Sequence, residues 1–446
     1  VIAEEGQTVE VAAENEPTKG HLKLIKTDRL NGNPIEGVIF DIYHHDAYGE
    51  GLAGSMVTDK NGIAVSSPLQ KGQYIVKERG TTVGYVFEEV TLQATVKSDE
   101  TTELTATNQP VQVRLTLYKR DADEYAGNPH AVPTVRGDGE LAGAEFQVLA
   151  AEDILDCQGN VIHEKGAVVV ASIKTVGEGG SATTEPLWPG LYEIVEVTPP
   201  TGYLPSTGSI TMDARGAAEQ SAEAIITYES VITNSIKLGA QAIVKILGDN
   251  SHDPDPSRVE TPESGAEFAV YLRKAGSYEA AREFERDYLT TDKNGYAMTK
   301  PLPYGIYMLE QVSGKAGYEI KGPIAFEIDG TESLVNPPPL TLNDRPILYR
   351  LRLVKTDAET GLPIALARTS FKLKDAEGKY VRQTIHYPKE QTIDTFTTDD
   401  TGGVTLPETL TWGLYFVEEV KAPDRYLLRT EDFAVMIGHE GDTPGN

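Results

Sequence analysis

The sequence has little cysteine, no long apolar run and a shortage of positive charge, and each absence excludes a class of protein. Its single cysteine, Cys157, excludes an intramolecular disulfide and any zinc site built on cysteines. No run of about 18 apolar residues occurs, so no segment is predicted to span a membrane. Lysine and arginine total 40 against 68 aspartates and glutamates, a net charge of −28. Because nucleic acid attracts clustered positive charge, this balance argues against a nucleic-acid-binding protein.

Signals of an enzyme and of a secretory leader are also missing. No Ser/His/Asp order, phosphate-binding loop or HExxH motif points to turnover of a substrate, so we expect neither an enzyme nor a cofactor. The chain does not open with the basic stretch and apolar core of a signal peptide, so we expect it to start inside a longer protein or after processing. Its 446 residues suffice for roughly three to four domains of about 100–150 residues.

Short alternations of apolar and polar residues recur from end to end and predict an all-β protein. Clear examples are residues 38–43 (VIFDIY), 73–77 (QYIVK) and 266–272 (AEFAVYL). The 42 glycines and 26 prolines, with Asn-Gly pairs at Asn61-Gly62 and Asn294-Gly295, suit many short strands joined by tight turns. Only residues 276–288 show helical spacing, with apolar side chains four apart, and we interpret them as a loop insertion between strands.

Four copies of one pattern organise the chain. Each copy opens with an apolar strand that carries one lysine and leads to an aspartate: Lys26 and Asp28, Lys119 and Asp121, Lys245 and Asp249, Lys355 and Asp357. A strand with a central phenylalanine follows, at Phe40, Phe146, Phe268 and Phe371. Next comes a Gly-x-Tyr strand that ends at Glu78, Glu196, Gln311 or Glu419, and then a further tyrosine, at Tyr85, Tyr203, Tyr318 or Tyr426. Three copies close with an asparagine, Asn108, Asn234 or Asn343, which precedes the next lysine by 11, 11 and 12 residues.

This spacing divides the chain into repeats at residues 20–109, 110–235, 236–344 and 345–446. Asn15 lies 11 residues before Lys26, so residues 1–19 are interpreted as the last strand of a preceding repeat. The fourth repeat is expected to lack its own last strand, because its acceptor asparagine would fall beyond residue 446. Short linkers that contain proline predict an elongated array.

In this order the motifs resemble the CnaB-type repeats, also called SpaA-like or prealbumin-like, of Gram-positive cell-wall adhesins and pilins. The elements KTD, AGAEF, GLYEIVEVTPPTGY and TN carry the resemblance, which covers nearly the whole chain. It implies one Ig-like β-sandwich per repeat, stacked as a structural stalk outside the cell and anchored in the cell wall. It also implies an autocatalytic isopeptide bond between the first-strand lysine and the last-strand asparagine, promoted by the glutamate of the Gly-x-Tyr strand.

Carried over residue by residue, the resemblance implies three cross-links: Lys26–Asn108, Lys119–Asn234 and Lys245–Asn343. The promoting acids would be Glu78, Glu196 and Glu419, whereas the third repeat has Gln311 at that position. The residue types suit the chemistry, because burial lowers the pKa of a lysine and leaves a nucleophilic amine. Burial is expected to raise the pKa of the carboxyl, which can then polarise the amide.

Several alternatives stay open on the sequence alone. The protein could instead bind a host surface or matrix ligand through the insertions that follow Asp121 and Asp249, because inserted loops often carry function. A β-sandwich region of a carbohydrate hydrolase is a further alternative, which nothing in the sequence favours. The other expected partners are further domains of the same surface protein.

Four smaller motifs give weaker signals. His44-His45-Asp46 is not predicted to bind metal, because neighbouring strand residues point to opposite faces. The acidic loop 249–255 lacks the central glycine of a calcium loop and is interpreted as a solvated insertion. Tyr387-Pro388-Lys389 resembles the element whose lysine joins sortase-built pilin subunits, without its flanking residues. Cys157 is expected to lie near solvent.

Overall fold

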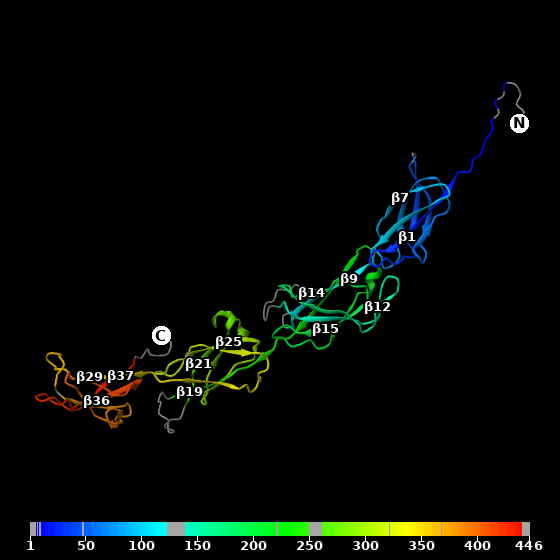
Figure 1. Ribbon diagram of the computed structural model, residues 1–446. Coiled ribbons are helices and arrows are strands. Elements are labelled where there is room, and N and C mark those ends of the chain that lie inside the picture. The colour runs from blue at the N-terminus through cyan, green and yellow to red at the C-terminus, as the bar shows by residue number, and fades with distance from the viewer. Residues whose placement is uncertain are drawn as a thin grey trace. The chain divides into compact units, whose positions relative to one another are not determined.

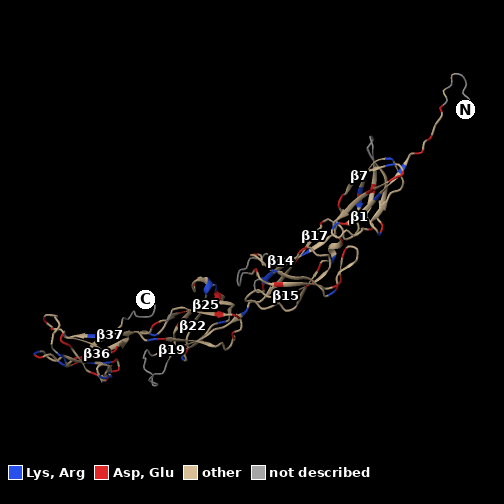
Figure 2. Ribbon diagram, viewed as in Figure 1, with Lys and Arg blue, Asp and Glu red and all other residues tan. Residues whose placement is uncertain are grey.

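The computed structural model describes residues 6, 8, 10–46, 49–122, 139–219, 222–248, 261–320, 322–366 and 368–438. Within these ranges the chain forms β-strands and three short 3-10 helices, with no α-helix, which confirms the all-β prediction. None of its described helices has the length and apolar content needed to cross a membrane. Acidic and basic side chains are interspersed along the strands of each repeat (Figure 2). The chain divides into two compact units, Val1–Ile236 and Lys237–Asn446 (Figure 1).

The first repeat is a sandwich of two four-stranded sheets. Its strands are β1 (Lys19–Asp28), β2 (Ile39–Asp46), β3 (Gly49–Val57), β4 (Ile63–Val65), β5 (Leu69–Gln70), β6 (Gly72–Gly80), β7 (Thr91–Val96) and β8 (Thr101–Asn108). One sheet has the order β4-β1-β5 with β8 also on β1, and the other has the order β3-β2-β6-β7. The core between the sheets includes Leu24, Phe40 and Val76. Residues 10–18, ahead of β1, belong to no strand.

The second repeat has the same plan and completes the first unit. Its elements are β9 (Gln112–Asp121), β10 (Glu145–Ala150), β11 (Ile154–Leu155), β12 (Val161–His163), β13 (Val168–Lys174), β14 (Ser181–Thr183), β15 (Leu191–Thr198), β16 (Ser209–Asp213), η1 (Arg215–Glu219) and β17 (Ile225–Asn234). The sheets have the orders β14-β9-β17 and β13-β10-β15-β16, and β11 and β12 form a separate hairpin. Leu117, Phe146 and Ile194 lie in the core between the two sheets.

The third repeat opens the second unit. Its elements are β18 (Leu238–Gly239), β19 (Ala242–Leu247), β20 (Thr261–Pro262), β21 (Glu267–Leu272), η2 (Arg273–Ala275), η3 (Glu283–Glu285), β22 (Arg286–Thr290), β23 (Tyr296–Met298), β24 (Leu302–Pro303), β25 (Gly305–Ser313), β26 (Ile324–Ile328) and β27 (Pro339–Asp344). The segment 276–288 lies mostly between β21 and β22, as a loop insertion would, and it forms turns and η3 in place of the α-helix that its spacing resembles. Its C-terminal part, from Arg286 to Tyr288, belongs to β22 and pairs with β21, and this pairing outweighs the weak tendency of so short a segment to form a helix.

The fourth repeat has the fewest strands on its first sheet. Its strands are β28 (Leu348–Tyr349), β29 (Arg352–Val354), β30 (Ser370–Lys374), β31 (Gln383–Ile385), β32 (Gln391–Ile393), β33 (Phe396–Thr397), β34 (Gly403–Thr405), β35 (Leu410–Thr411), β36 (Gly413–Lys421) and β37 (Phe433–Ile437). One sheet has the order β33-β30-β36-β37. Among the residues described in this repeat, β29 pairs with β34 and has no parallel neighbour.

The first and last strands of the other three repeats run side by side in parallel. β1 pairs with β8, β9 with β17 and β19 with β27. In the first repeat the register sets Asn108 opposite Asp28, two residues after Lys26. Because residues two apart share a face of a strand, the lysine and the asparagine project into the same core. The second repeat repeats this register with Asn234 opposite Asp121.

Two recurring devices hold the strands that carry these residues. The tyrosine of every Gly-x-Tyr strand donates a hydrogen bond to the carbonyl four residues upstream: Tyr74 to Gln70, Tyr192 to Trp188, Tyr307 to Pro303 and Tyr415 to Thr411. The turn glycine Gly62, with a φ of 70°, accepts the backbone hydrogen bond of Lys26 at 2.8 Å. A Cβ at this glycine would lie 2.3 Å from the Lys26 carbonyl oxygen, so only glycine allows the approach.

Candidate cross-linking sites

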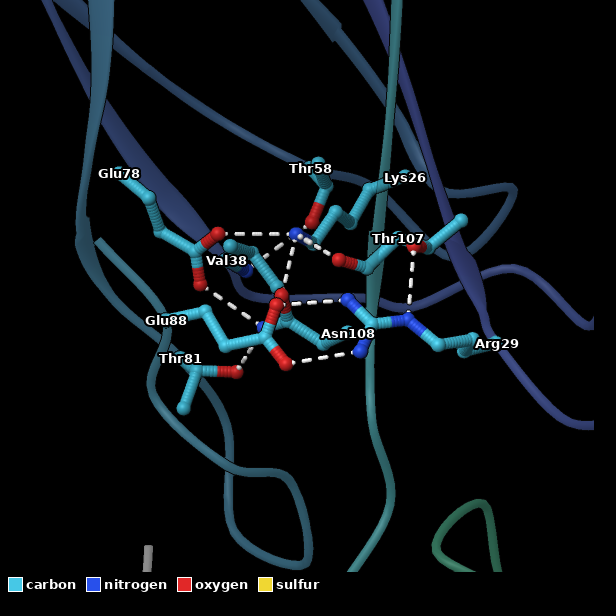
Figure 3. Close-up of polar contacts among 9 residues, drawn as sticks. All are labelled: Lys26, Arg29, Val38, Thr58, Glu78, Thr81, Glu88, Thr107 and Asn108. Carbon is cyan, nitrogen blue, oxygen red and sulfur yellow. Dashed lines mark hydrogen bonds and ion pairs between the residues drawn. The ribbon is translucent and has the colours of Figure 1, made fainter. Parts of the chain in front are cut away.

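A buried triangle of lysine, glutamate and asparagine lies in the core of the first repeat (Figure 3). Lys26 is fully buried, and its Nζ lies 2.8 Å from Glu78 Oε2 and 2.5 Å from Asn108 Oδ1. Asn108 Nδ2 donates to Glu78 Oε1 at 2.8 Å and to Thr81 Oγ1 at 2.8 Å. The aromatic ring of Phe40 lies under the amine, with its centroid 5.6 Å from Nζ. Burial lowers the pKa of Lys26, although Glu78 acts in the opposite direction.

The second repeat holds the same triangle with one added hydroxyl. Lys119 is fully buried, with Nζ 2.8 Å from Glu196 Oε1 and 2.5 Å from Asn234 Oδ1. Asn234 Nδ2 donates to Glu196 Oε1 at 3.0 Å. Ser206 donates its hydroxyl to Asn234 Oδ1 at 2.7 Å and its backbone N–H to Glu196 Oε2 at 2.6 Å. Burial also lowers the pKa of Lys119.

The protonation of the acid in the second repeat differs from the sequence-based expectation. Burial is the largest single influence on Glu196 and raises its pKa, but the hydrogen bonds from Lys119 and Ser206 together outweigh it. The pKa of Glu196 is therefore lowered overall, and the expectation of a raised value is wrong for this residue.

The third repeat brings a different set of residues to its lysine. Lys245 is fully buried, with Nζ 2.8 Å from Asp344 Oδ2 and 3.5 Å from Glu263 Oε2. Gln311 donates its side-chain amide to Asp344 Oδ2 at 2.8 Å. The other oxygen of Glu263, Oε1, accepts a hydrogen bond from the backbone N–H of Lys315 at 2.6 Å. Two carboxyl groups thus face one buried amine.

The expected acceptor Asn343 is not part of this set, and the strand register gives the reason. Asn343 lies opposite Ile246, whereas Asp344 lies opposite Leu247, two residues after Lys245. Neighbouring strand residues point to opposite faces, so the Asn343 amide projects away from Lys245. It packs against Gly248, where an added Cβ would come within 2.1 Å of Asn343 Oδ1. The prediction that pairs Lys245 with Asn343 is therefore corrected to Asp344.

The described residues of the fourth repeat bring together an amine and an acid. Lys355 Nζ lies 2.9 Å from Glu419 Oε1, and the lysine side chain is 20% exposed. Arg429 donates its backbone N–H to Glu419 Oε2 at 3.0 Å, the contact that Ser206 makes with Glu196. Because β29 has no parallel neighbour among the described residues, the described part of this repeat places no acceptor amide or carboxyl opposite the lysine.

In the first, second and fourth repeats, the aspartate two residues after the lysine accepts a hydrogen bond from the tyrosine that follows the Gly-x-Tyr strand. Tyr85 donates its hydroxyl to Asp28 Oδ2 at 2.9 Å, and Tyr203 and Tyr426 do the same to Asp121 and Asp357 at 2.9 and 2.6 Å. The pair connects the end of the first strand to the loop after the acid strand. The aspartate and the tyrosine recur as separate motifs in the sequence, and the structure shows that they bind each other.

We expect Tyr85→Phe to destabilise the first repeat by about 1–3 kcal/mol, because it removes a hydrogen bond from a buried carboxylate. Asp28 is 2% exposed and Tyr85 is 1% exposed. The matched control is Tyr426→Phe, whose hydroxyl makes the same bond but whose ring is 41% exposed, so little change is expected. Hydrogen exchange in the full chain, followed through denaturant, measures the difference, over residues 19–108 for Tyr85→Phe and over residues 348–437 for Tyr426→Phe. Equal effects of the two substitutions would contradict the role of burial.

The remaining motifs lie away from the triangles. Cys157 is half-buried, not near solvent as expected: its thiol donates to the Gly84 carbonyl at 3.0 Å, and burial raises its pKa to about 12. Tyr387-Pro388-Lys389 forms an exposed turn between β31 and β32. Among the described residues no three acidic, histidine or cysteine side chains gather as a metal site.

Three of the earlier interpretations fall wholly or largely outside the described residues. The acidic loop 249–255 does so entirely, as does most of each insertion that could form a ligand-binding surface, 122–140 and 250–263. The side chains of His45 and Asp46 are also outside the description.

Sequence reasoning missed four residues of the sites. Ser206 and Thr81 come from loops whose position relative to the asparagine no local pattern gives. Glu263 lies before a strand where the other repeats have an aliphatic residue. Asp344 did have a signal, since it precedes Lys355 by 11 residues, the spacing that Asn108 and Asn234 keep from the next lysine.

Comparison with known proteins gives the following matches. The model of the SpaA family, a prealbumin-like fold domain, matches four segments of the chain: 20–110, 135–224, 258–336 and 350–444. The trypsin-resistant surface T6 protein of Streptococcus pyogenes serotype M6 is 27% identical over 187 residues, 42% of this chain and 31% of that protein. The match therefore spans less than a third of the relative.

Two solved structures are similar in part. The Bacillus anthracis TIE protein matches with a TM-score of 0.45 and 23% identity, over 74% of this chain and 50% of that one. BcpA, the major pilin subunit of Bacillus cereus, matches with a TM-score of 0.28 and 15% identity, over 74% of this chain and 99% of that one.

Proposed function

Because the chain belongs to the SpaA family of prealbumin-like fold domains, we propose that it is a structural shaft of a Gram-positive surface protein or pilin. Its repeats are taken to be 20–109, 110–235, 236–344 and 345–446, a division that the four separate hydrophobic cores support. The shaft lies outside the cell, on the cell wall, next to other domains of the same protein. The first two repeats are closed by amide bonds, Lys26–Asn108 and Lys119–Asn234.

The buried triangle is the observation that carries this proposal. In two repeats the same three residue types meet in the core with lysine Nζ 2.5 Å from the asparagine carbonyl oxygen. A buried amine, amide and carboxyl held in contact convert a slow reaction between separate molecules into one within a single site. A buried ion pair is at best a weak source of stability. A role in stability alone would therefore not explain why an asparagine contacts both the lysine and the glutamate.

The contacts of Glu78 give each proton a route. Glu78 Oε2 faces Lys26 Nζ and can take a proton from it, which frees the amine to attack Asn108 Cγ. Glu78 Oε1 faces Asn108 Nδ2 and can deliver that proton to the departing nitrogen. The new C–N bond forms, the old one breaks, and ammonia leaves. The lysine amine loses its remaining spare proton to water or to ammonia, and no cofactor or co-reactant is needed.

Ser206 adds a donor at the atom where negative charge develops in the second repeat. Its hydroxyl donates to Asn234 Oδ1, the oxygen that becomes an oxyanion when the amine adds to the carbonyl carbon. Thr81 in the first repeat instead accepts from Asn108 Nδ2 and orients the leaving nitrogen. The two sites therefore support the same reaction with different neighbours.

The mass of the intact chain tests the cross-links. Each Lys–Asn bond expels one ammonia, about 17 Da, so the first two repeats together should lower the mass by about 34 Da. Glu78→Gln and Glu196→Gln keep the shape of the side chain but cannot relay a proton, and each should restore one ammonia. Glu103→Gln, on an exposed ion pair with Lys23, is the control and should restore none. A wild-type chain without the deficit in either repeat would refute the cross-links.

A further inference from the structure

Lys245 of the third repeat is surrounded by different residues from the lysines of the first two repeats: Asp344, Glu263 and Gln311. We propose that it forms a third cross-link, to the carboxyl of Asp344, with Glu263 as the proton carrier. The inference rests on the chemistry proposed for the first two repeats but involves a different acceptor, a different acid and a different leaving group.

Asp344 occupies the acceptor position by register. It lies opposite the residue two after the lysine, as Asn108 and Asn234 do in their repeats. Its Oδ2 is 2.8 Å from Lys245 Nζ, and the residue is 1% exposed. The amine therefore faces a carboxyl carbon where the other repeats present an amide carbon.

In the third repeat the carboxyl near the lysine comes from a different position in the chain than in the other repeats. Gln311 lies opposite Phe268, the place that Glu78, Glu196 and Glu419 hold opposite the matching phenylalanine of their repeats. The missing carboxyl reappears in Glu263, whose backbone N–H donates to the Lys245 carbonyl at 3.0 Å.

The same backbone bond is made by aliphatic residues in the other repeats, Ile35, Leu141 and Ile364. Glutamate has thus become glutamine at one position, and an aliphatic residue has become glutamate at another. The change to Gln311 alone would leave the site without an acid, and the change to Glu263 alone would give it two. Together they keep one acid and one acceptor at the lysine.

Each neighbour of Asp344 has a distinct task. Gln311 cannot relay a proton, but its amide donates to Asp344 Oδ2 at 2.8 Å and orients the carboxyl toward the amine. Glu263 is 6% exposed and 3.5 Å from Nζ, within reach of the amine's protons. The backbone N–H of Lys315 holds its other oxygen at 2.6 Å, which fixes the side chain.

The reaction balances without any other reagent. The Lys245 ammonium loses two protons, its nitrogen bonds to Asp344 Cγ, and one carboxylate oxygen leaves with both protons as water. Glu263 takes each proton and hands it to the departing oxygen, and it ends in the state in which it began. A buried ammonium–carboxylate pair is replaced by a neutral amide, which removes the cost of keeping two charges out of water.

Peptide mapping of the full chain by mass spectrometry tests this link separately from the first two. We expect a branched peptide that joins Lys245 to Asp344 and is lighter by about 18 Da, the mass of water, whereas the first two repeats lose about 17 Da each. Asp344→Asn should keep the branch and change its loss to about 17 Da. Asn343→Ala is the matched control and should leave the branch unchanged.

Two variants test the moved acid. Glu263→Gln should abolish the branch, and Glu263→Ile with Gln311→Glu, which restores the arrangement of the other repeats, should recover it. An unbranched Lys245 peptide in a wild-type chain whose first two repeats are linked would overturn this inference alone. A branch to Asn343, or one that persists in Glu263→Gln, would overturn it as well. Loss of all three branches would also refute the proposed function.

Discussion

A chain pulled by its two ends is expected to hold its first repeat closed, and Glu78→Gln is expected to let that repeat extend by about 290 Å. Lys26 and Asn108 are separated by 82 residues, and each extended residue spans about 3.3–3.6 Å. With the amide bond in place, the force passes from β1 across the bond to the end of β8 and never reaches the residues between them. Without the bond, that segment unfolds under load.

Single-molecule force spectroscopy on the full chain measures this release. The corresponding substitution in the second repeat, Glu196→Gln, should release 115 residues, or about 400 Å, so the two repeats can be told apart by length. Glu103→Gln should release neither. Wild-type molecules that show both extensions would contradict the proposed amide bonds in the first two repeats.

A second large effect is expected on the free energy of unfolding of the second repeat. Lys119→Met with Glu196→Leu removes the bond and both charges but keeps an apolar core, so it should cost about 4–5 kcal/mol, the chain-entropy value for a link that closes 115 residues. Glu196→Ala also removes the bond but leaves Lys119 buried without its acid. It should cost about 3–5 kcal/mol more, because an unpaired buried charge is strongly destabilising.

Tryptophan fluorescence in guanidinium chloride can follow this transition in the full chain. Trp188 packs against the core of the second repeat, and Trp412 lies in the fourth repeat and serves as an internal reference. The transition of Trp188 should move to lower denaturant while that of Trp412 stays in place. If the double substitution lowers the free energy of unfolding as much as Glu196→Ala does, the unpaired charge of Lys119 is not the cause of the extra loss.

Most of the fold could be predicted from local sequence pattern, and residues 276–288 show where such a pattern misleads. Alternation of apolar residues and the turn glycines indicated strands throughout, since both depend on neighbours in sequence. The segment 276–288 has helical spacing, yet its end pairs with β21 as β22. That outcome depends on a strand the local pattern does not include.

The sites were predictable where residue identity and spacing agreed. Lys26 with Asn108 and Lys119 with Asn234 were found because asparagine recurs in step with lysine. In the third repeat an asparagine one residue away from the required position drew the prediction to Asn343, although the 11-residue spacing favoured Asp344. A shift of one residue reverses the face of a strand, and only the pairing of β19 with β27 decides it. Glu263 required a contact between distant segments and had no sequence signal.

The lysine and asparagine proposed to react lie at opposite ends of their repeat, so folding of the repeat must come before the bond. Asn108 and Asn234 belong to the last strand of their repeats, 82 and 115 residues after the lysine. A partly synthesised repeat has no acceptor, and a complete but unfolded one does not bring acceptor, acid and amine together. The proposed bond can therefore form only after a repeat is complete and folded, and an unfolded chain stays free of cross-links. The presence of the bond in a repeat would then show that its last strand has paired with its first strand.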